Sequence, residues 1–409
     1  MPEINTGDTA WVLVSAALVL LMTPGLALFY GGMVRKKNVV GTLMQSFIVI
    51  ALISVQWVLW GYSLAFSPGE SGLIGGLSWV GLRGVGLEPN PAYAATIPHQ
   101  AFMVFQLMFA VITPALITGA FAERMKFKTF LVFILLWATL VYDPIAFWVW
   151  NPEGWLRKLG ALDFAGGTVV HISSGVSALA AAVVLGKRLG YGREPMEAHN
   201  ISMSVLGAGL LWFGWFGFNA GSALGAGALA TSAFVVTNTA GAMGALAWMF
   251  TAWAMTGKAS LLGAASGAVV GLVAITPASG FVGPMGALAI GGGAGVLCYL
   301  AVRFRNRRNV DDSLDVWACH GIGGTWGALA TGIFAIAAIN PAGADGLLSG
   351  NARQLAVQAL AVAVVWVYAF VMTWVILKVL DRVMGVRVSP VEELVGLDLS
   401  QHSEAGYRL

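Results

Sequence analysis

The sequence predicts an all-α integral membrane protein of eleven transmembrane helices, with two inverted five-helix halves and a C-terminal eleventh helix. Three observations predict this fold. Of the 409 residues, 58% are hydrophobic and 10% are charged, whereas an ordinary soluble domain is about 25% charged. Apolar runs of about 20 residues, the length that crosses a bilayer, recur along the chain. Lys and Arg are concentrated in alternate loops between these runs.

Eleven apolar runs are separated by charge clusters or by segments rich in Pro, Gly and Asn. The eighth run is short and is interrupted by Thr276 and Pro277. The 53 glycines suit closely packed membrane helices. The first run is expected to be retained, because the residues before it lack the basic segment of a secretory signal. The runs lie near residues 9–31, 40–66, 98–122, 128–150, 165–186, 200–220, 231–256, 260–277, 284–304, 317–337 and 353–380.

The placement of Lys and Arg predicts the orientation of the spans. All but four of the 22 basic residues fall in alternate loops or in the C-terminal tail, which includes Arg408. Loops rich in Lys and Arg face the cytoplasm. The N-terminus is therefore expected outside the cell and the C-terminus in the cytoplasm. The four exceptions are Arg83, Arg157, Lys158 and Arg353.

The fifth and tenth expected spans share a short pattern, a histidine followed by glycine four residues later. It reads HISSG at 171–175 and HGIGG at 320–324. Because five is odd, two five-span halves would be inverted relative to each other, as is common in transporters. The expected organisation is a membrane domain, 1–383, with halves of about 9–190 and 200–340 and an extra helix at 353–380, followed by a cytoplasmic regulatory tail at 384–409.

Of the five histidines, only His171 and His320 are expected deep in the bilayer. An ionisable side chain in hydrocarbon needs a partner or a water-filled cavity, and it commonly marks a functional site. A hydrogen bond between helices is the purely structural alternative. Cys319 lies next to His320, and the two together are a candidate metal site. No metal-ligand spacing supports such a site, so we expect no metal and no cofactor. Two neutral imidazoles in contact would leave outer nitrogens for a small polar molecule.

Asp163 precedes the fifth expected span, eight residues before His171. Eight helical residues rise about 12 Å, which places the carboxylate near the outer mouth. Asp163 is either a helix N-cap or a group that keeps an outer vestibule negative. Aromatic residues gather in the same region, including Trp150. Most would belong to the core or to the interfacial belt, but an indole face beside a negative vestibule can bind a small cation.

These residues lie in segments that resemble the ammonium transporter (Amt) family. The resemblance runs from Thr6 to the C-terminus. The matching segments are PGLALFYGG at 24–32, GAFAER at 119–124, DFAGGTVVH at 163–171, FGWFGFNAGS at 213–222, GLVAITPA at 271–278, CHG at 319–321 and GLDLSQHSE at 396–404.

The resemblance implies an external ammonium recruitment site formed by Trp150, Phe109 and Ser222. It also implies that Asp163 is the buried aspartate that supports recruitment and takes part in deprotonation. Trp150 is placed by the segment WVW at 148–150, and the residues that follow it depart from the family pattern. Trp148 therefore remains the alternative indole.

The resemblance further implies a pore below this site. Phe109 and Phe218 resemble the stacked pair that gates it, and His171 with His320 resemble the twin histidines that line it. Ammonium would be deprotonated at the entrance, and ammonia would pass along the two imidazoles. Separate transfer of the proton would make net ammonium uptake electrogenic.

The resemblance also implies a homotrimer with one pore per subunit in the inner or plasma membrane, and a possible PII-type regulatory protein on the cytoplasmic face. The alternative functions are a neutral ammonia gas channel of the Rh type, an ammonium sensor, and a metal or proton-coupled carrier. No nucleophile–base pair or cofactor motif predicts an enzyme, and no nucleic-acid partner is expected.

Overall fold

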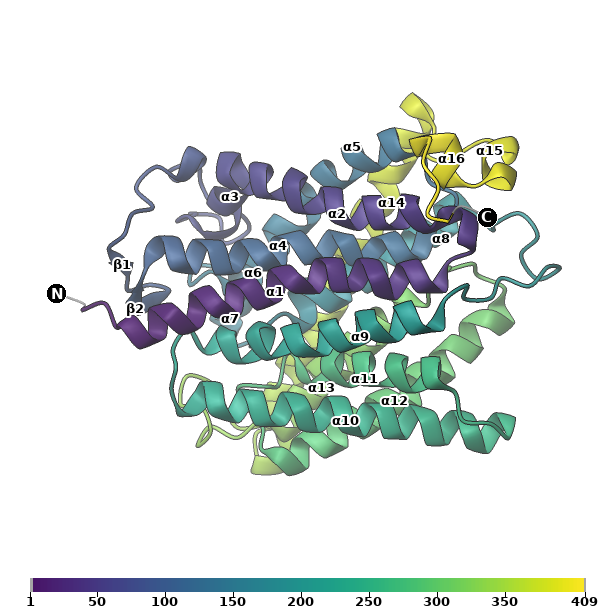
Figure 1. The fold of residues 1–409 in the computed structure, drawn as a ribbon. Helices are drawn as coiled ribbons and strands as arrows, with labels where there is room; N and C mark the ends of the chain where they lie inside the picture. The colour runs from purple at the N-terminus through teal and green to yellow at the C-terminus, as the bar shows by residue number, and fades with distance from the viewer. Residues whose placement is uncertain (1–2, 408–409) are drawn as a thin grey trace.

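The computed structural model describes residues 3–407 and is predominantly helical. Figure 1 shows long helices packed side by side, with the connecting segments at the two ends of the bundle. Within residues 3–407, nine helical segments are long and apolar enough to cross a membrane. They are Thr6–Met33, Lys36–Phe66, His99–Phe121, Phe127–Leu159, Gly167–Leu185, Ile201–Ala223, Ala228–Thr256, Pro284–Arg308 and Ala352–Met384.

Several of these segments join an α-helix to a π-helical turn. In the N-terminal part the elements are α1 (Thr6–Met33), α2 (Val39–Gln56), η2 (Trp57–Gly61), α3 (Tyr62–Phe66), β1 (Pro89–Asn90), β2 (Ala94–Pro98), α4 (His99–Phe121), α5 (Phe127–Trp137), η4 (Ala138–Tyr142), α6 (Asp143–Trp150), α7 (Trp155–Leu159), η5 (Gly167–Ile172) and α8 (Ser173–Leu185). The strands β1 and β2 pair antiparallel.

The C-terminal part also joins α-helices to π-helical turns. Its elements are α9 (Ile201–Trp215), η6 (Phe216–Ala220), α10 (Ala228–Thr256), α11 (Leu261–Ile275), α12 (Pro284–Arg308), η8 (Trp317–Ile322), α13 (Gly323–Phe334), α14 (Ala352–Met384), α15 (Pro390–Val395) and α16 (Leu397–His402). Short 3-10 turns are η1 (Lys36–Asn38), η3 (Val80–Leu82), η7 (Gly221–Ala223) and η9 (Leu347–Ser349).

Each of the eleven expected ranges overlaps one helical segment. The eighth range corresponds to α11, which has 15 residues. The tenth corresponds to η8 together with α13, which run without a break from Trp317 to Phe334. Hydropathy and charge therefore placed the helices within a few residues of their observed ends.

Local sequence sets several helix starts. The side chains of Asn5, Asn200 and Ser260 precede α1, α9 and α11 and accept hydrogen bonds from backbone N–H groups three residues later. Such caps satisfy N–H groups that have no partner inside the helix.

The two ends of the bundle differ in character. The strands β1 and β2 and the start of α1 lie at one end, called here the hairpin end, whereas α15 and α16 lie at the opposite tail end (Figure 1). Basic loops gather at the tail end, where Arg35 and Arg188 bind Glu123, and Arg387 binds Glu393. Arg408, which belongs to the expected basic tail, lies outside the described residues.

The outer surface of the bundle is apolar. Large hydrophobic side chains are exposed on α2, α9, α12 and α14, including Phe47, Leu206, Met285 and Val367. Soluble proteins rarely expose apolar surface over so many helices. The chain is therefore a multi-pass membrane protein whose outer helix faces contact lipid.

The two histidine-bearing helices cross at close range. A Cβ atom on Gly175 would lie 2.0 Å from the backbone nitrogen of Gly321, and one on Gly324 would lie 2.9 Å from His171 Cβ. Each glycine therefore makes room for the histidine segment of the other helix. This reciprocal contact explains why glycine follows each histidine by four residues.

The crossing predicts that Gly324→Ala destabilises the protein. Overpacking of this kind typically costs about 1–3 kcal/mol, and here the added methyl group meets the His171 side chain at its stem. Gly209→Ala is the matched control, because nothing lies within 4 Å of a Cβ built there. Thermal unfolding of the detergent-solubilised variants measures the effect. Equal melting temperatures for the two variants would contradict the proposed crowding.

Candidate functional site

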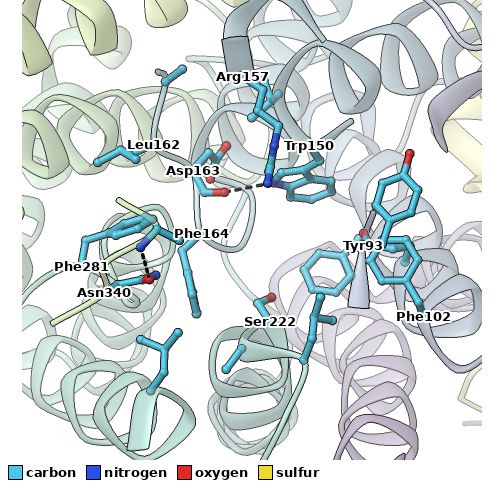
Figure 2. A pocket seen from close by; sticks show the side chains of 18 of the residues that line it. Tyr93, Phe102, Trp150, Arg157, Leu162, Asp163, Phe164, Ser222, Phe281 and Asn340 are labelled. Carbon is cyan, nitrogen blue, oxygen red and sulfur yellow. Dashed lines mark hydrogen bonds between the residues drawn. The ribbon is translucent and has the colours of Figure 1, made fainter. Parts of the chain in front are cut away.

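A cavity of about 440 Å³ opens at the hairpin end of the bundle. Figure 2 shows Trp150, Asp163, Ser222 and Tyr93 arranged around it. Its lining also includes Phe109, whose ring contacts that of Phe218. The cavity thus combines aromatic faces with a few polar groups contributed by different helices.

Trp150 ends helix α6 and is held by one hydrogen bond. Its indole N–H donates to the backbone oxygen of Asp163 over 3.0 Å, and its ring meets Phe109 edge to face with centroids 5.7 Å apart. Trp148 lies elsewhere, because its N–H donates to the Leu73 oxygen and its ring packs against Tyr368. Of the two candidate indoles, the structure brings Trp150 to the cavity.

Ser222 lies in the turn η7 after helix α9. Its hydroxyl donates to the backbone oxygen of Phe218 over 2.8 Å. A serine hydroxyl has one proton and two lone pairs. With the proton committed to Phe218, the oxygen can only accept from a molecule in the cavity.

Asp163 begins the segment that leads into η5. Its carboxylate accepts from the backbone N–H groups of Gly166, Gly167 and Thr168 over 2.7, 2.6 and 2.8 Å, and from the Thr168 hydroxyl. Both carboxylate oxygens therefore have donors within the protein. Asp163 caps the histidine-bearing helix with its side chain and holds Trp150 with its carbonyl, so it positions both.

Two phenylalanines separate the cavity from the bundle interior. The rings of Phe109 and Phe218 have centroids 4.4 Å apart at an interplanar angle of 43°. Both side chains are 1% exposed. The pair closes the direct path between the cavity and the imidazole of His171, which lies 6.0 Å from the Phe218 ring, measured between centroids.

Beyond the pair lies a narrow apolar lumen of about 10 Å³, roughly enough for a single water-sized sphere. Its polar groups are the imidazoles of His171 and His320 and the indole of Trp215. The remaining lining residues are Met22, Leu26, Phe29, Ile112, Leu116, Val170, Leu211, Phe218 and Val269. A molecule in this lumen has almost no protein hydrogen-bond partners except the two imidazoles.

The two imidazoles contact each other through their Nδ1 atoms, which lie 3.3 Å apart. The Nε2 atom of His171 lies 3.3 Å from the Thr276 hydroxyl oxygen. That hydroxyl donates its single proton to Leu272 and already accepts from the Trp215 indole. Thr276 can therefore only accept from His171.

This count of donors defines the tautomers. We infer that neutral His171 carries its proton on Nε2 and accepts on Nδ1. The Nδ1 atom of His320 must then be the donor in the contact between the rings. The Nε2 atom of His320 is left with a free lone pair in the lumen, which makes it an acceptor for a small N–H donor.

Two side chains of this site were not anticipated from the sequence. Thr276 anchors His171, and its sequence signals were its place before Pro277 in an interrupted helix and inside the family-like segment at 271–278. Arg157 lines the cavity, and Figure 2 shows its side chain near Trp150 and Asp163. The pair Arg157 and Lys158 between two spans carries no pattern from which the position of the Arg157 side chain could be predicted.

No group of three or more His, Cys, Asp or Glu side chains within residues 3–407 is placed to hold a metal ion. The polar groups around the cavity and the lumen are instead single hydrogen-bond acceptors and donors. The arrangement suits a small molecule that carries several N–H bonds.

Comparisons with known proteins agree with this chemistry. A family model described as the ammonium transporter family matches residues 10–407. An ammonium transporter from Bacillus subtilis (strain 168) is 53% identical over 404 residues, which cover 98% of each chain. The ammonium transporter Amt1 from Archaeoglobus fulgidus is 50% identical over 403 residues, covering 98% of this chain and 100% of that protein.

Solved structures share the fold. The crystal structure of Saccharomyces cerevisiae Mep2 superposes with a TM-score of 0.89 at 38% identity, covering 95% of this chain and 88% of that one. A structure described as a sensor Amt protein gives a TM-score of 0.89 at 30% identity, covering 97% and 98% of the two chains.

The tautomer assignment is testable by ¹⁵N NMR of histidine-labelled protein. The protonated nitrogens are expected to be Nε2 in His171 and Nδ1 in His320. Thr276→Val removes the acceptor for His171 Nε2 while keeping the branched shape, so mixed tautomers are expected in that variant. A single, unchanged set of imidazole shifts in Thr276→Val would show that Thr276 does not define the tautomers.

Proposed function

The chain belongs to the ammonium transporter family, and on that premise we propose that it recruits NH₄⁺ at the hairpin-end cavity, removes one proton and conducts NH₃ through the lumen. The observation that carries the proposal is the order of environments along one line. An aromatic cavity with a hydroxyl acceptor is followed by the closed pair Phe109 and Phe218, and then by an apolar lumen whose imidazoles touch.

Recruitment must distinguish ammonium from potassium, which has the same charge and a similar size. The faces of Trp150 and Phe109 attract either cation through the ring quadrupole. Ammonium also donates N–H bonds, whereas potassium donates none. The Ser222 oxygen, whose own proton is committed to Phe218, accepts one such bond and so favours ammonium.

Passage beyond the phenylalanine pair favours loss of the proton. Carrying a bare charge into hydrocarbon costs at least several kcal/mol. Desolvation also lowers the pKa of an amine by as much as about 3–5 pH units. Ammonium can lose its charge as a proton, but potassium cannot. Neutral ammonia can then donate to the free Nε2 lone pair of His320 as it moves along the lumen.

We propose that the released proton crosses the membrane separately from ammonia, which makes net ammonium uptake electrogenic. A neutral Rh-type ammonia channel is the alternative that shares the lumen. The cation site built from Trp150, Phe109 and Ser222 favours a protein that collects the charged form. An ammonium sensor is the second alternative, because one solved neighbour is described as a sensor Amt protein; substrate flux through the purified protein separates the two.

We also propose the topology and assembly that this function requires. Helix α11 and the η8–α13 segment cross the membrane with the nine longer segments, which gives eleven spans. The hairpin end faces outside, and the basic tail end faces the cytoplasm. The halves at about 9–190 and 200–340 are inverted repeats, and 384–409 is a regulatory tail. By analogy with the family, the protein is a homotrimer of the cell membrane that a PII-type protein can regulate.

Ser222→Ala is predicted to weaken ammonium recruitment. A hydrogen bond to a charged group contributes about 1.5–3 kcal/mol, so the half-saturating ammonium concentration should rise roughly tenfold or more. Currents from proteoliposomes on a solid-supported membrane measure it. Ser71→Ala, in an exposed loop at the same end, is the control and should leave the concentration dependence unchanged. An unchanged value in Ser222→Ala would remove Ser222 from the recruitment site.

His171→Asp is predicted to weaken the exclusion of potassium. A fixed carboxylate in the lumen would stabilise an intact cation where the wild type offers only neutral imidazoles. The measurement compares currents after equal pulses of potassium and ammonium. His199→Asp, which adds the same charge in a tail-end loop, should still exclude potassium. If His171→Asp excludes potassium as well as the wild type does, the neutral lumen is not the basis of selectivity.

A further inference from the structure

Each histidine-bearing helix is preceded by an aspartate at the same distance. The segments DFAGGTVVH at 163–171 and DSLDVWACH at 312–320 both place aspartate eight residues before histidine. Both aspartates lie just before a π-helical turn, η5 or η8. Asp312 accepts from the backbone N–H of Trp317 over 2.7 Å, so it caps its helix as Asp163 caps the other. Asp312 is thus the tail-end counterpart of Asp163.

The two carboxylates differ in how completely they are hydrogen-bonded. Both oxygens of Asp163 accept from donors within the protein. In Asp312, Oδ2 accepts from Trp317, whereas Oδ1 has no partner. The Asp312 side chain is fully buried, with 0% exposure. A buried charged oxygen without a donor is unfavourable, and binding a proton removes that charge.

Charged and titratable groups from several elements surround Asp312. Arg305 on α12 and Asp315 in the same loop are the nearest charges, and they bind each other over 2.6 Å. Arg124, Tyr30 and Cys319 are the other titratable groups around it. The Asp315 side chain is 33% exposed, and the Asp315 backbone N–H donates to the Asp312 carbonyl oxygen over 3.4 Å, so Asp315 lies beside Asp312 and reaches solvent.

The loop that contains Asp312 and Val316 also lies close to the helix segment that lines the lumen. Phe29 lines the lumen, and Tyr30 follows it in α1. A Cβ atom built on Gly119 would lie 2.8 Å from the Tyr30 ring and 2.6 Å from the Val316 side chain. The Tyr30 ring and Val316 therefore meet at one point. The segment Phe29–Tyr30 of α1 therefore contacts the lumen through Phe29 and approaches the loop that contains Asp312 through Tyr30.

We propose that Asp312 accepts the proton that leaves the tail-end mouth of the lumen and passes it through Asp315 to the water at that end. The inference rests on the proposed function, in which the proton crosses separately from ammonia. The Asp312 carboxylate becomes a carboxylic acid when the proton arrives and returns to the carboxylate when Asp315 and then water take it. The new O–H bond on Asp312 forms as a hydronium ion at the mouth gives up one proton and becomes water, and it breaks when Asp315 and then water take that proton.

The acid–base behaviour of Asp312 suits this task. Burial raises the pKa of Asp312 to about 6, and nearby Arg305 opposes that rise. Above this pH the carboxylate is ionised and can accept a proton, and below it the group is already protonated. Ammonium current should therefore fall as the tail-side pH is lowered through about 6, provided that Asp312 is present.

The test uses Asp312→Asn in proteoliposomes. Asparagine keeps an oxygen that can accept from Trp317, but it cannot bind and release a proton. Ammonium-evoked current should fall roughly tenfold or more, as expected for loss of a proton-transfer group. Ammonia permeation, measured as internal alkalinisation, should persist. Asp312→Glu should recover part of the current. Glu194→Gln, which removes an exposed carboxylate from the same end, should keep both activities.

The outcomes separate this proposal from the proposed function. If the wild type carries a current and Asp312→Asn shows the same current with the same pH dependence, the proposed role of Asp312 is overturned. The proposed function is then unaffected. Loss of both current and ammonia permeation would assign Asp312 to pore structure and would also overturn it. If Asp312→Asn does not fold, the test uses Asp315→Asn, which should lower the ammonium current several-fold. An unchanged current in Asp315→Asn would overturn proton transfer from Asp312 through Asp315. Absence of current in the wild type would instead refute the electrogenic function.

Discussion

An ion cannot enter a narrow hydrocarbon lumen without losing its hydration, and the rest of the structure depends on this constraint. The lumen between Phe218 and Phe29 is only about 10 Å³ in volume and is lined almost entirely by apolar side chains. A charge that cannot be hydrated there must be left behind. Ammonium alone among the common monovalent cations can leave its charge behind as a proton. In the proposed mechanism, the aromatic cavity collects the cation and the imidazoles serve the neutral product.

The polar groups of the pathway each use one hydrogen bond for the fold and keep another for the substrate. Ser222 donates to Phe218 and keeps its oxygen lone pairs for a cation. His171 donates to Thr276 and receives from His320, which keeps Nε2 free. Because unsatisfied polar groups are costly in such surroundings, these internal bonds fix the direction in which each remaining atom can interact. We propose that selectivity follows from that fixed direction as much as from charge.

Much of this arrangement could be predicted from the sequence, because hydropathy and charge placement respond to the bilayer itself. The helix ranges followed from the length of the apolar runs, whereas the pairing of His171 with His320 was implied by the family resemblance. The π-helical turns could not be predicted, since such turns are rare and local propensity carries no signal for them. The anchoring of His171 by Thr276 and the unpartnered oxygen of Asp312 are tertiary features that no local pattern encodes.

The most direct test of the central claim is the charge moved per nitrogen. Purified protein in liposomes would be given an ammonium gradient, and the current and the uptake of ¹⁵N-labelled ammonium would be measured on the same preparation, with potassium as the comparison ion. The account predicts about one charge for each nitrogen, because every deprotonated ammonium sends its proton across separately, and no current with potassium. Nitrogen uptake without charge, or a potassium current equal to that of ammonium, would contradict it.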